Sequence, residues 1–131
     1  MKTLQLSLKR DWFEMTKSGV KTEDYREINA YWCSRLLLFD GKKKSMDFWH
    51  GRLEFFPVSN LTMNNYITAI VADTNKMTLG YPIKTDTSRI LIFKHDGIEI
   101  NTGKPQWGAE PGKLYFVVKH GKRIKPLVDH I

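Results

Sequence analysis

The segment from Gly19 to Arg26 concentrates the residue types that acid–base chemistry and phosphate binding require. Two cations and two carboxylates lie within six residues: Lys21, Glu23, Asp24 and Arg26. Side chains two residues apart share one face of a strand, so Asp24 and Arg26 should lie together. A carboxylate beside a guanidinium fixes that planar group and directs its other donors toward a phosphate or a base edge. The same pattern is typical of solvated charges on an edge strand, so the residue types alone leave both interpretations open.

Other reactive side chains give weaker signals. The histidines are far apart in the sequence, at His50, His95, His120 and His130. None forms a close pair with another histidine or with the single cysteine, so we expect neither a metal nor a cofactor. Cys33 follows a tryptophan on a predicted helix, where a lone cysteine is typical of a small core residue. The loop Gly103–Gly112 lacks the GxxxxGK[ST] spacing of a phosphate-binding loop.

The aromatic residues divide between packing and binding. Trp12 and Trp32 lie on predicted helices, where burial in the core is the usual role of such a side chain. Trp107 lies in a loop rich in glycine and proline, where core packing and stacking on a base are both reasonable interpretations. The run Lys42–Lys44 is typical of a solvated loop, with a secondary role in attracting phosphate.

The pattern Gly19-x-Lys21-x-x-Asp24-x-Arg26 is similar to the GxKxxExR signature of ASCH domains, which belong to the PUA-like superfamily of small RNA-associated barrels. The resemblance includes LSLKRDWFEMTKSG before the signature and YREINAYWCSRL after it. It extends to IEINTGKPQWG, which leads into KLYFVVK. The chain thus resembles small stand-alone ASCH-like proteins of bacteria and their phages, although Asp40–Arg89 contributes nothing to the match.

The resemblance implies a PUA-like β-barrel with a cationic cleft beside the signature strand, and binding of RNA or a modified nucleoside. One branch of the superfamily is an acetylcytidine amidohydrolase that uses Lys and Thr of the signature and a Glu from elsewhere. Lys21 matches that lysine, but Asp24 stands at the threonine position, and a carboxylate cannot act as an activated hydroxyl nucleophile. Some ASCH proteins resemble ribonucleases. A hydrolase with Lys21 and Asp24 as catalytic residues is therefore the alternative to a binding domain.

Composition limits the remaining classes. The chain of 131 residues has the size of a single domain, 1–131, and its 41% of hydrophobic residues exclude a wholly disordered chain. A membrane helix would need about 20 apolar residues in succession, and no such stretch occurs. The first residues lack the pattern of a signal peptide, so we expect a cytoplasmic protein without a membrane partner. The net charge of +7 favours a polyanionic partner.

Periodicity predicts the elements at the start of the chain. Leucines alternate with polar residues over residues 3–8, the pattern of a half-buried strand. Asp11 is suited to cap a short helix, which should end before Gly19. Asn29 is suited to cap a second helix over Ala30–Leu38.

The rest of the chain reads mostly as short strands. They are predicted at Lys21–Ile28, Leu53–Phe56, Tyr66–Ala72, Arg89–Phe93, Ile98–Ile100 and Leu114–Lys119. His95-Asp96-Gly97 is a hairpin signal and His120-Gly121 a turn signal. Together with the resemblance, these patterns predict an α+β fold: a small, mostly antiparallel PUA-like β-barrel with two short N-terminal helices.

The predicted binding site combines the signature, the loop tryptophan and nearby cations. Five basic residues and no acid occur between Lys113 and Lys125, so this segment should attract a phosphate backbone. The candidate RNA- or nucleoside-binding residues are Lys21, Asp24, Tyr25, Arg26, Trp107, Arg10, Lys113, Lys119, Lys122 and Arg123.

Overall fold

The computed structural model describes residues 2–55 and 66–126, which form two compact units. The first unit comprises residues 2–23, 71–96 and 119–126, and the second comprises residues 24–55, 66–70 and 97–118. Neither unit is continuous in the sequence. Two long strands, β6 (Ile90–Thr102) and β7 (Leu114–Lys125), run from one unit into the other.

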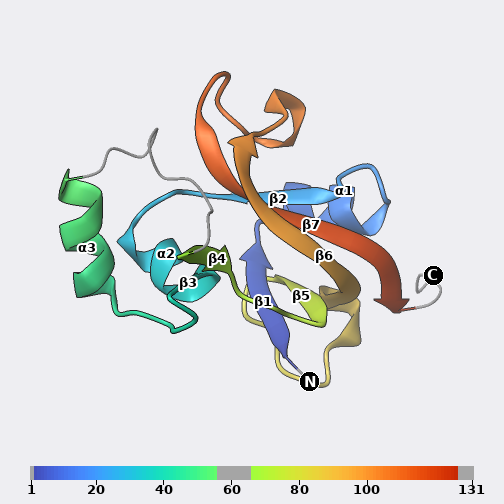
Figure 1. Ribbon diagram of the computed structural model, residues 1–131. Coiled ribbons are helices and arrows are strands. Elements are labelled where there is room, and N and C mark those ends of the chain that lie inside the picture. Colours follow the sequence, from blue (N-terminus) through green and yellow to red (C-terminus); the bar gives the residue numbers. More distant parts are fainter. Residues whose placement is uncertain (1, 56–65, 127–131) are drawn as a thin grey trace. The chain divides into compact units, whose positions relative to one another are not determined.

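The chain has a mixed α+β architecture. Its larger sheet has five strands in the order β1-β5-β6-β7-β2, where β1 is Thr3–Leu8, β2 is Glu23–Arg26 and β5 is Thr74–Leu79. Strand β1 pairs with β5 in parallel, and β5 pairs with β6 in the antiparallel sense. Figure 1 shows β1 and β5 side by side in the first unit. The alternation predicted for residues 3–8 is confirmed, because Leu4, Leu6 and Leu8 are all buried.

Helix α1 (Arg10–Lys17) follows β1 in the first unit. The predicted cap is wrong: the helix begins one residue before Asp11, which lies in the first turn, where its charge still complements the helix dipole. The predicted end is confirmed. Ser18 is the C-cap, and Gly19 follows with a φ of 86°, a conformation that glycine adopts without steric cost.

A buried asparagine joins three strands of the first unit. The amide nitrogen of Asn75, on β5, donates to the carbonyl oxygen of Lys119 at 3.0 Å and to His120 Nδ1 at 2.9 Å. Its amide oxygen lies 2.7 Å from His95 Nδ1, which must therefore be the donor. His120 also stacks on Phe93, with 5.0 Å between the ring centroids. The amide thus fixes β5, β6 and β7 relative to one another within this unit.

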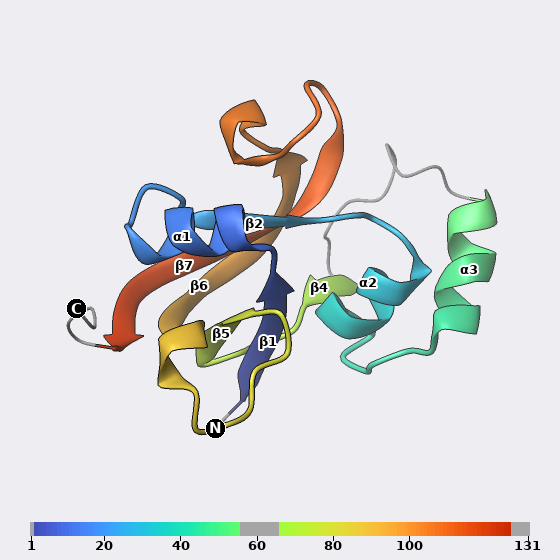
Figure 2. The ribbon, with the colours of Figure 1, turned by 180° about the vertical axis from the view of Figure 1, so that it is seen from behind.

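The second unit contains helices α2 (Ala30–Leu36) and α3 (Met46–Phe55) and the small antiparallel sheet of β3 (Leu37–Phe39) and β4 (Ile67–Ala69). Figure 2 shows α2 between β4 and α3. The predicted cap of α2 is confirmed, because Asn29 Oδ1 accepts a hydrogen bond from the backbone N–H of Trp32 at 2.9 Å. No helix in the described chain is long and apolar enough to cross a membrane.

Further corrections concern one predicted strand and two predicted turns. Residues 53–55 of the predicted strand Leu53–Phe56 form the end of α3, and residue 56 lies outside the described residues. A short apolar run does not separate a strand from a helix. The decisive signal was Ser45, whose hydroxyl accepts from the backbone N–H of Phe48 at 3.2 Å and caps the helix.

The other two corrections concern turns. His95-Asp96-Gly97 forms no hairpin, because Ile90–Lys94 pairs with β5 and Gly97, with a φ of 105°, continues β6. His120-Gly121 likewise lies inside β7. A Cβ at Gly121 would lie 3.2 Å from the carbonyl oxygen of Lys94, so this glycine permits a close backbone approach.

The asparagine network leads to a prediction about pH. Burial lowers the pKa of His95 below its ordinary value of 6.5, although the nearby Asp96 acts in the opposite direction. As the pH falls through about 6.5, the unfolded chain takes up a proton that the folded protein resists, so the free energy of unfolding should decrease. Urea unfolding at pH about 7.5 and about 5.5 measures this change. The His95→Gln variant should lose part of the dependence; an undiminished dependence would assign it to other groups.

Candidate functional site

Lys21 is a buried structural cation of the first unit. Only 3% of its surface is exposed, and its Nζ donates to the carbonyl oxygen of Glu23 at 2.5 Å. Its backbone N–H donates to the carbonyl oxygen of Met15 at 3.0 Å. The side chain therefore holds the segment that leads from α1 into β2. The lysine of the signature therefore has a structural role in this protein.

The predicted pairing of Asp24 with Arg26 is confirmed in the second unit. Arg26 Nε lies 2.6 Å from Asp24 Oδ2, and the two side chains are 17% and 7% exposed. The i, i+2 spacing on β2 places both on one face, as the sequence predicted. A short charge-assisted hydrogen bond away from bulk water fixes the orientation of the guanidinium.

Arg26 belongs to a larger group, the guanidinium–indole cluster, which also contains Tyr31, Trp32 and Arg35. The guanidinium carbons of Arg26 and Arg35 lie 4.9 Å and 5.1 Å from the centroid of the Trp32 ring. Arg35 also lies 5.8 Å from the Tyr31 ring, and the two aromatic rings meet edge to face at 5.0 Å. Two cations thus share one indole, an arrangement that ring quadrupoles favour.

The cluster corrects the prediction for Trp32. This side chain is half-buried, and Tyr31 is 45% exposed, so these rings lie at the surface of the second unit and not in its core. The sequence carried a signal for the cluster, because Tyr31 and Arg35 are four residues apart on α2 and therefore neighbours on its surface. Only the tertiary structure adds Arg26 from β2. The other helical tryptophan, Trp12, is also half-buried.

Tyr25 and Trp107 lie in a second polar and aromatic group of the same unit. The Tyr25 hydroxyl accepts from the backbone N–H of Lys104 at 3.0 Å, and Lys104 Nζ lies 4.3 Å from the Trp107 ring centroid. Trp107 is only 8% exposed. Of the two interpretations that the sequence left open for this residue, the geometry agrees with packing, and Lys104 covers the ring.

The remaining predicted cations are distributed over both units. In the second unit, Lys113 Nζ lies 2.8 Å from Glu27 Oε1, and this hydrogen bond raises the pKa of the lysine. In the first unit, Arg123 donates to the carbonyl oxygen of Lys17 at 3.2 Å, and Arg10 lies 3.7 Å from Glu14. Lys119 is half-buried and Lys122 is exposed. Adjacent residues of β7 point to opposite faces, so the basic segment does not form one continuous stripe.

The described residues contain neither a reactive cysteine nor a metal-binding cluster. Cys33 is completely buried, and burial raises the pKa of its thiol to about 12, so the thiolate nucleophile is scarcely present at neutral pH. No group of three or more histidine, cysteine, aspartate or glutamate side chains is arranged to hold a metal within residues 2–55 and 66–126. His130 lies outside these residues.

A cavity that the sequence did not predict lies in the first unit. Its volume is about 440 Å³, and its lining contains none of the predicted site residues. Its walls come from β5, the loop that holds Lys84, the 3₁₀ turn Thr87–Arg89, β6, and the end of β7 with Pro126. These segments are distant in the sequence, so no local motif predicts the cavity.

No family model, curated protein or solved structure matches the chain.

The role of Lys21 can be separated from its charge. Lys21→Met keeps the length of the side chain and removes the ammonium, which leaves a buried hydrogen bond unmade and should lower the free energy of unfolding by about 1–3 kcal/mol. Lys122→Met is the matched control, because Lys122 is exposed in the same unit. Denaturant unfolding measures both variants, and equal effects would contradict a structural role for Lys21.

The contact between Tyr25 and the loop at Lys104 requires glycine at position 103, because there is no room for a Cβ. A Cβ at Gly103 would lie 2.7 Å from the Ala109 Cβ and 2.8 Å from the Tyr25 ring. Gly103→Ala should therefore lower the free energy of unfolding by about 1–3 kcal/mol, as other overpacked positions do. In Gly51→Ala the new Cβ meets open space within α3, and the gain in helix propensity should be stabilising by about 0.5–1 kcal/mol. Thermal unfolding that leaves Gly103→Ala unaffected would show that Tyr25 moves without cost.

Proposed function

We propose that the protein binds single-stranded RNA or a modified nucleoside through the guanidinium–indole cluster of its second unit. The resemblance to ASCH domains supplied the expectation of this ligand class. The proposal extends to the fold, with the five-stranded sheet as the sheet of a PUA-like barrel.

The observation that carries the proposal is the placement of two guanidinium groups over one half-buried indole. Arg26 and Arg35 approach the same Trp32 ring from β2 and from α2. Unstacked bases of RNA stack on aromatic rings and on guanidinium planes, and guanidinium groups also bind phosphate in a bidentate manner. One small surface therefore offers both kinds of contact that a nucleotide makes.

The acid beside the cluster prepares it for an anion. Asp24 holds Nε of Arg26 at 2.6 Å, so this guanidinium is oriented before any ligand arrives. A pre-oriented side chain loses less conformational freedom on binding than a mobile one. Tyr31, which is 45% exposed beside Arg35, offers an accessible ring edge and face next to the cations.

Hydrolysis by Lys21 and Asp24 is the competing function. Lys21 Nζ donates to a backbone carbonyl oxygen and Asp24 pairs with Arg26, so each residue has at least one contact that serves the fold. Binding without catalysis is accordingly the function that the geometry supports best.

Binding of a fluorescently labelled single-stranded RNA, followed by anisotropy at low salt, tests the proposal. Trp32→Ala should weaken binding by about 1–3 kcal/mol, the value of one base stacked on an aromatic ring. Arg35→Gln should weaken binding by about 1.5–3 kcal/mol, the value of a hydrogen bond to a charged group. The logarithm of the affinity should fall with the logarithm of the salt concentration, with a slope of about −0.7 for each phosphate contact.

Lys43→Gln is the control, because it removes one positive charge from an exposed side chain in the same unit. If Lys43→Gln weakens RNA binding as much as Arg35→Gln does, the binding depends on net charge and not on the guanidinium–indole cluster. Absence of RNA binding at low salt, together with absence of binding to acetylated and unmodified nucleosides, would overturn the proposal. Incubation with both substrate classes followed by mass spectrometry tests hydrolysis, since shortened RNA or deacetylated nucleosides would show that a bond is broken.

A further inference from the structure

The outer face of the first unit's sheet is unusual in its mixture of residues. In the register of β5 and β6, Lys76 lies opposite Ile92 and Thr78 lies opposite Ile90. The neighbouring pairs, Asn75 with Phe93 and Met77 with Leu91, are buried on the other face. Alternation therefore directs Lys76, Ile90 and Ile92 away from the main core. Two branched apolar side chains on this face are stabilised when another group covers them and removes them from water.

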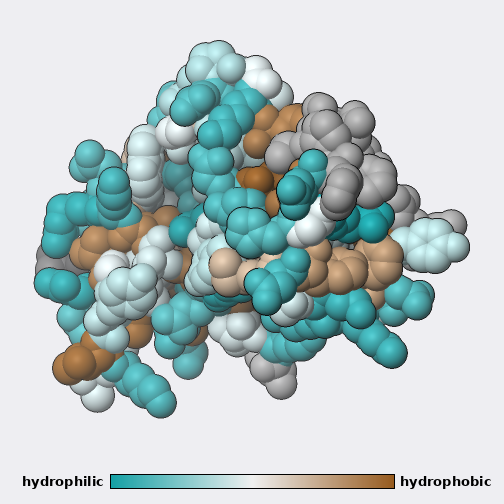
Figure 3. Space-filling view, turned by 90° about the vertical axis from the view of Figure 1, so that its left-hand side faces the viewer, coloured by the Kyte–Doolittle hydropathy of each residue, from teal (hydrophilic) through white to brown (hydrophobic). Residues whose placement is uncertain are grey.

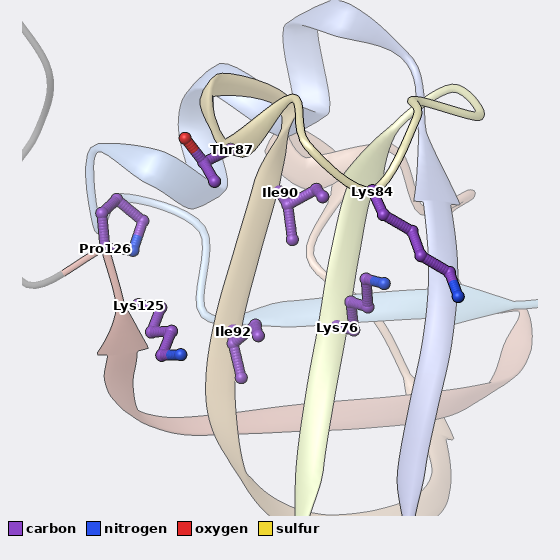
Figure 4. Close-up of a pocket in the computed structure, with 7 residues that line it drawn as sticks. All are labelled: Lys76, Lys84, Thr87, Ile90, Ile92, Lys125 and Pro126. Atoms are coloured by element: carbon purple, nitrogen blue, oxygen red, sulfur yellow. The ribbon is translucent and has the colours of Figure 1, made fainter.

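That covering is incomplete and leaves the cavity of about 440 Å³. Figure 4 shows Ile90 and Ile92 between two groups of side chains, with Lys76 and Lys84 on one side and Lys125 and Pro126 on the other. Thr87 adds a hydroxyl at the end of the cavity from which β6 begins. The volume lies within the range of about 300–1,000 Å³ that small-molecule pockets occupy.

Among the residues that the structure describes, the charged side chains that line the cavity are three lysines, and no carboxylate lines it. Asp86, the acid in the loop between Lys84 and Thr87, is paired with Arg89 at 3.3 Å. None of the three lysines has an ion pair with another residue of the described chain. Three like charges around one small space repel one another, and an anion in that space would relieve the repulsion.

We infer that this cavity binds a small phosphate monoester with an apolar body, at a site separate from the guanidinium–indole cluster. A phosphate monoester carries between one and two negative charges near neutral pH, offers three acceptor oxygens and suits ammonium donors. The phosphate lies between Lys76 and Lys84, and the apolar body covers Ile90 and Ile92. Its far end reaches Pro126 and the stem of Lys125, whose methylene groups also present apolar surface.

Hexyl phosphate is the probe, with inorganic phosphate and hexanol as its two halves. Isothermal titration calorimetry gives the affinities, and methyl NMR spectra of the isoleucines report whether Ile90 and Ile92 lie beside the ligand. Hexyl phosphate should bind at least about tenfold more tightly than either half, because only the complete molecule makes both the ionic and the apolar contacts. Equal affinity for inorganic phosphate, or no binding of hexyl phosphate at millimolar concentration, overturns the inference.

Variants locate the ligand. Lys76→Ala and Lys84→Ala should each weaken hexyl phosphate about tenfold, whereas Lys43→Ala, in the second unit, should leave its affinity unchanged. Ile92→Thr keeps a β-branched side chain and should weaken hexyl phosphate about fivefold without changing the affinity for inorganic phosphate. Circular dichroism confirms that each variant is folded. Equal losses of hexyl phosphate affinity in Lys76→Ala and Lys43→Ala would contradict the assignment of the ligand to this cavity.

Competition separates this site from the proposed RNA surface. A single-stranded RNA added to the protein saturated with hexyl phosphate should leave the isoleucine methyl signals in place. Displacement of hexyl phosphate by the RNA would make the cavity a phosphate subsite of RNA and would overturn its assignment to a small molecule. Because no RNA binding is required for hexyl phosphate to bind, failure of the proposed RNA function and failure of this inference give different results.

Discussion

The buried amide of Asn75 is the constraint on which the first unit depends. An unpaired amide in the core would cost several kcal/mol, so its hydrogen bonds to His95, His120 and the carbonyl oxygen of Lys119 must form together. These bonds fix which residues of β5, β6 and β7 are adjacent. Since side chains alternate along a strand, an inward Asn75 also determines that Lys76 points outward, toward the cavity. One polar group thus sets both the packing of the core and the chemistry of the opposite face.

The second unit is organised by a different interaction, the ion pair of Asp24 and Arg26. Its short distance and low exposure hold the guanidinium over Trp32, where Arg35 approaches the same ring from α2. The pair matters less for its own contribution to stability than for the direction it gives to a charged group. A carboxylate on one strand thereby determines the surface that a helix presents.

The two units present cations in different surroundings. In the second unit the cations are guanidinium groups stacked on aromatic rings, which suits planar bases and phosphates. In the first they are ammonium groups around branched aliphatic side chains, which suits a compact anion with an apolar body. The net charge of +7 is the sum of such local arrangements. Figure 3 shows one face, on which both hydrophilic and hydrophobic side chains reach the surface.

The sequence by itself determined the local features: the alternating strand of residues 3–8, the Asn29 cap, the glycine after α1 and the pairing of Asp24 with Arg26. Each depends on residues a few positions apart, whose geometry follows from strand or helix period. The tertiary structure decided which strands pair, so the hairpin signal at Gly97 became part of a long strand when Ile90–Lys94 paired with β5. It also decided the surroundings of Trp32 and the existence of the cavity. Those features join residues from distant segments, and no local period encodes such contacts.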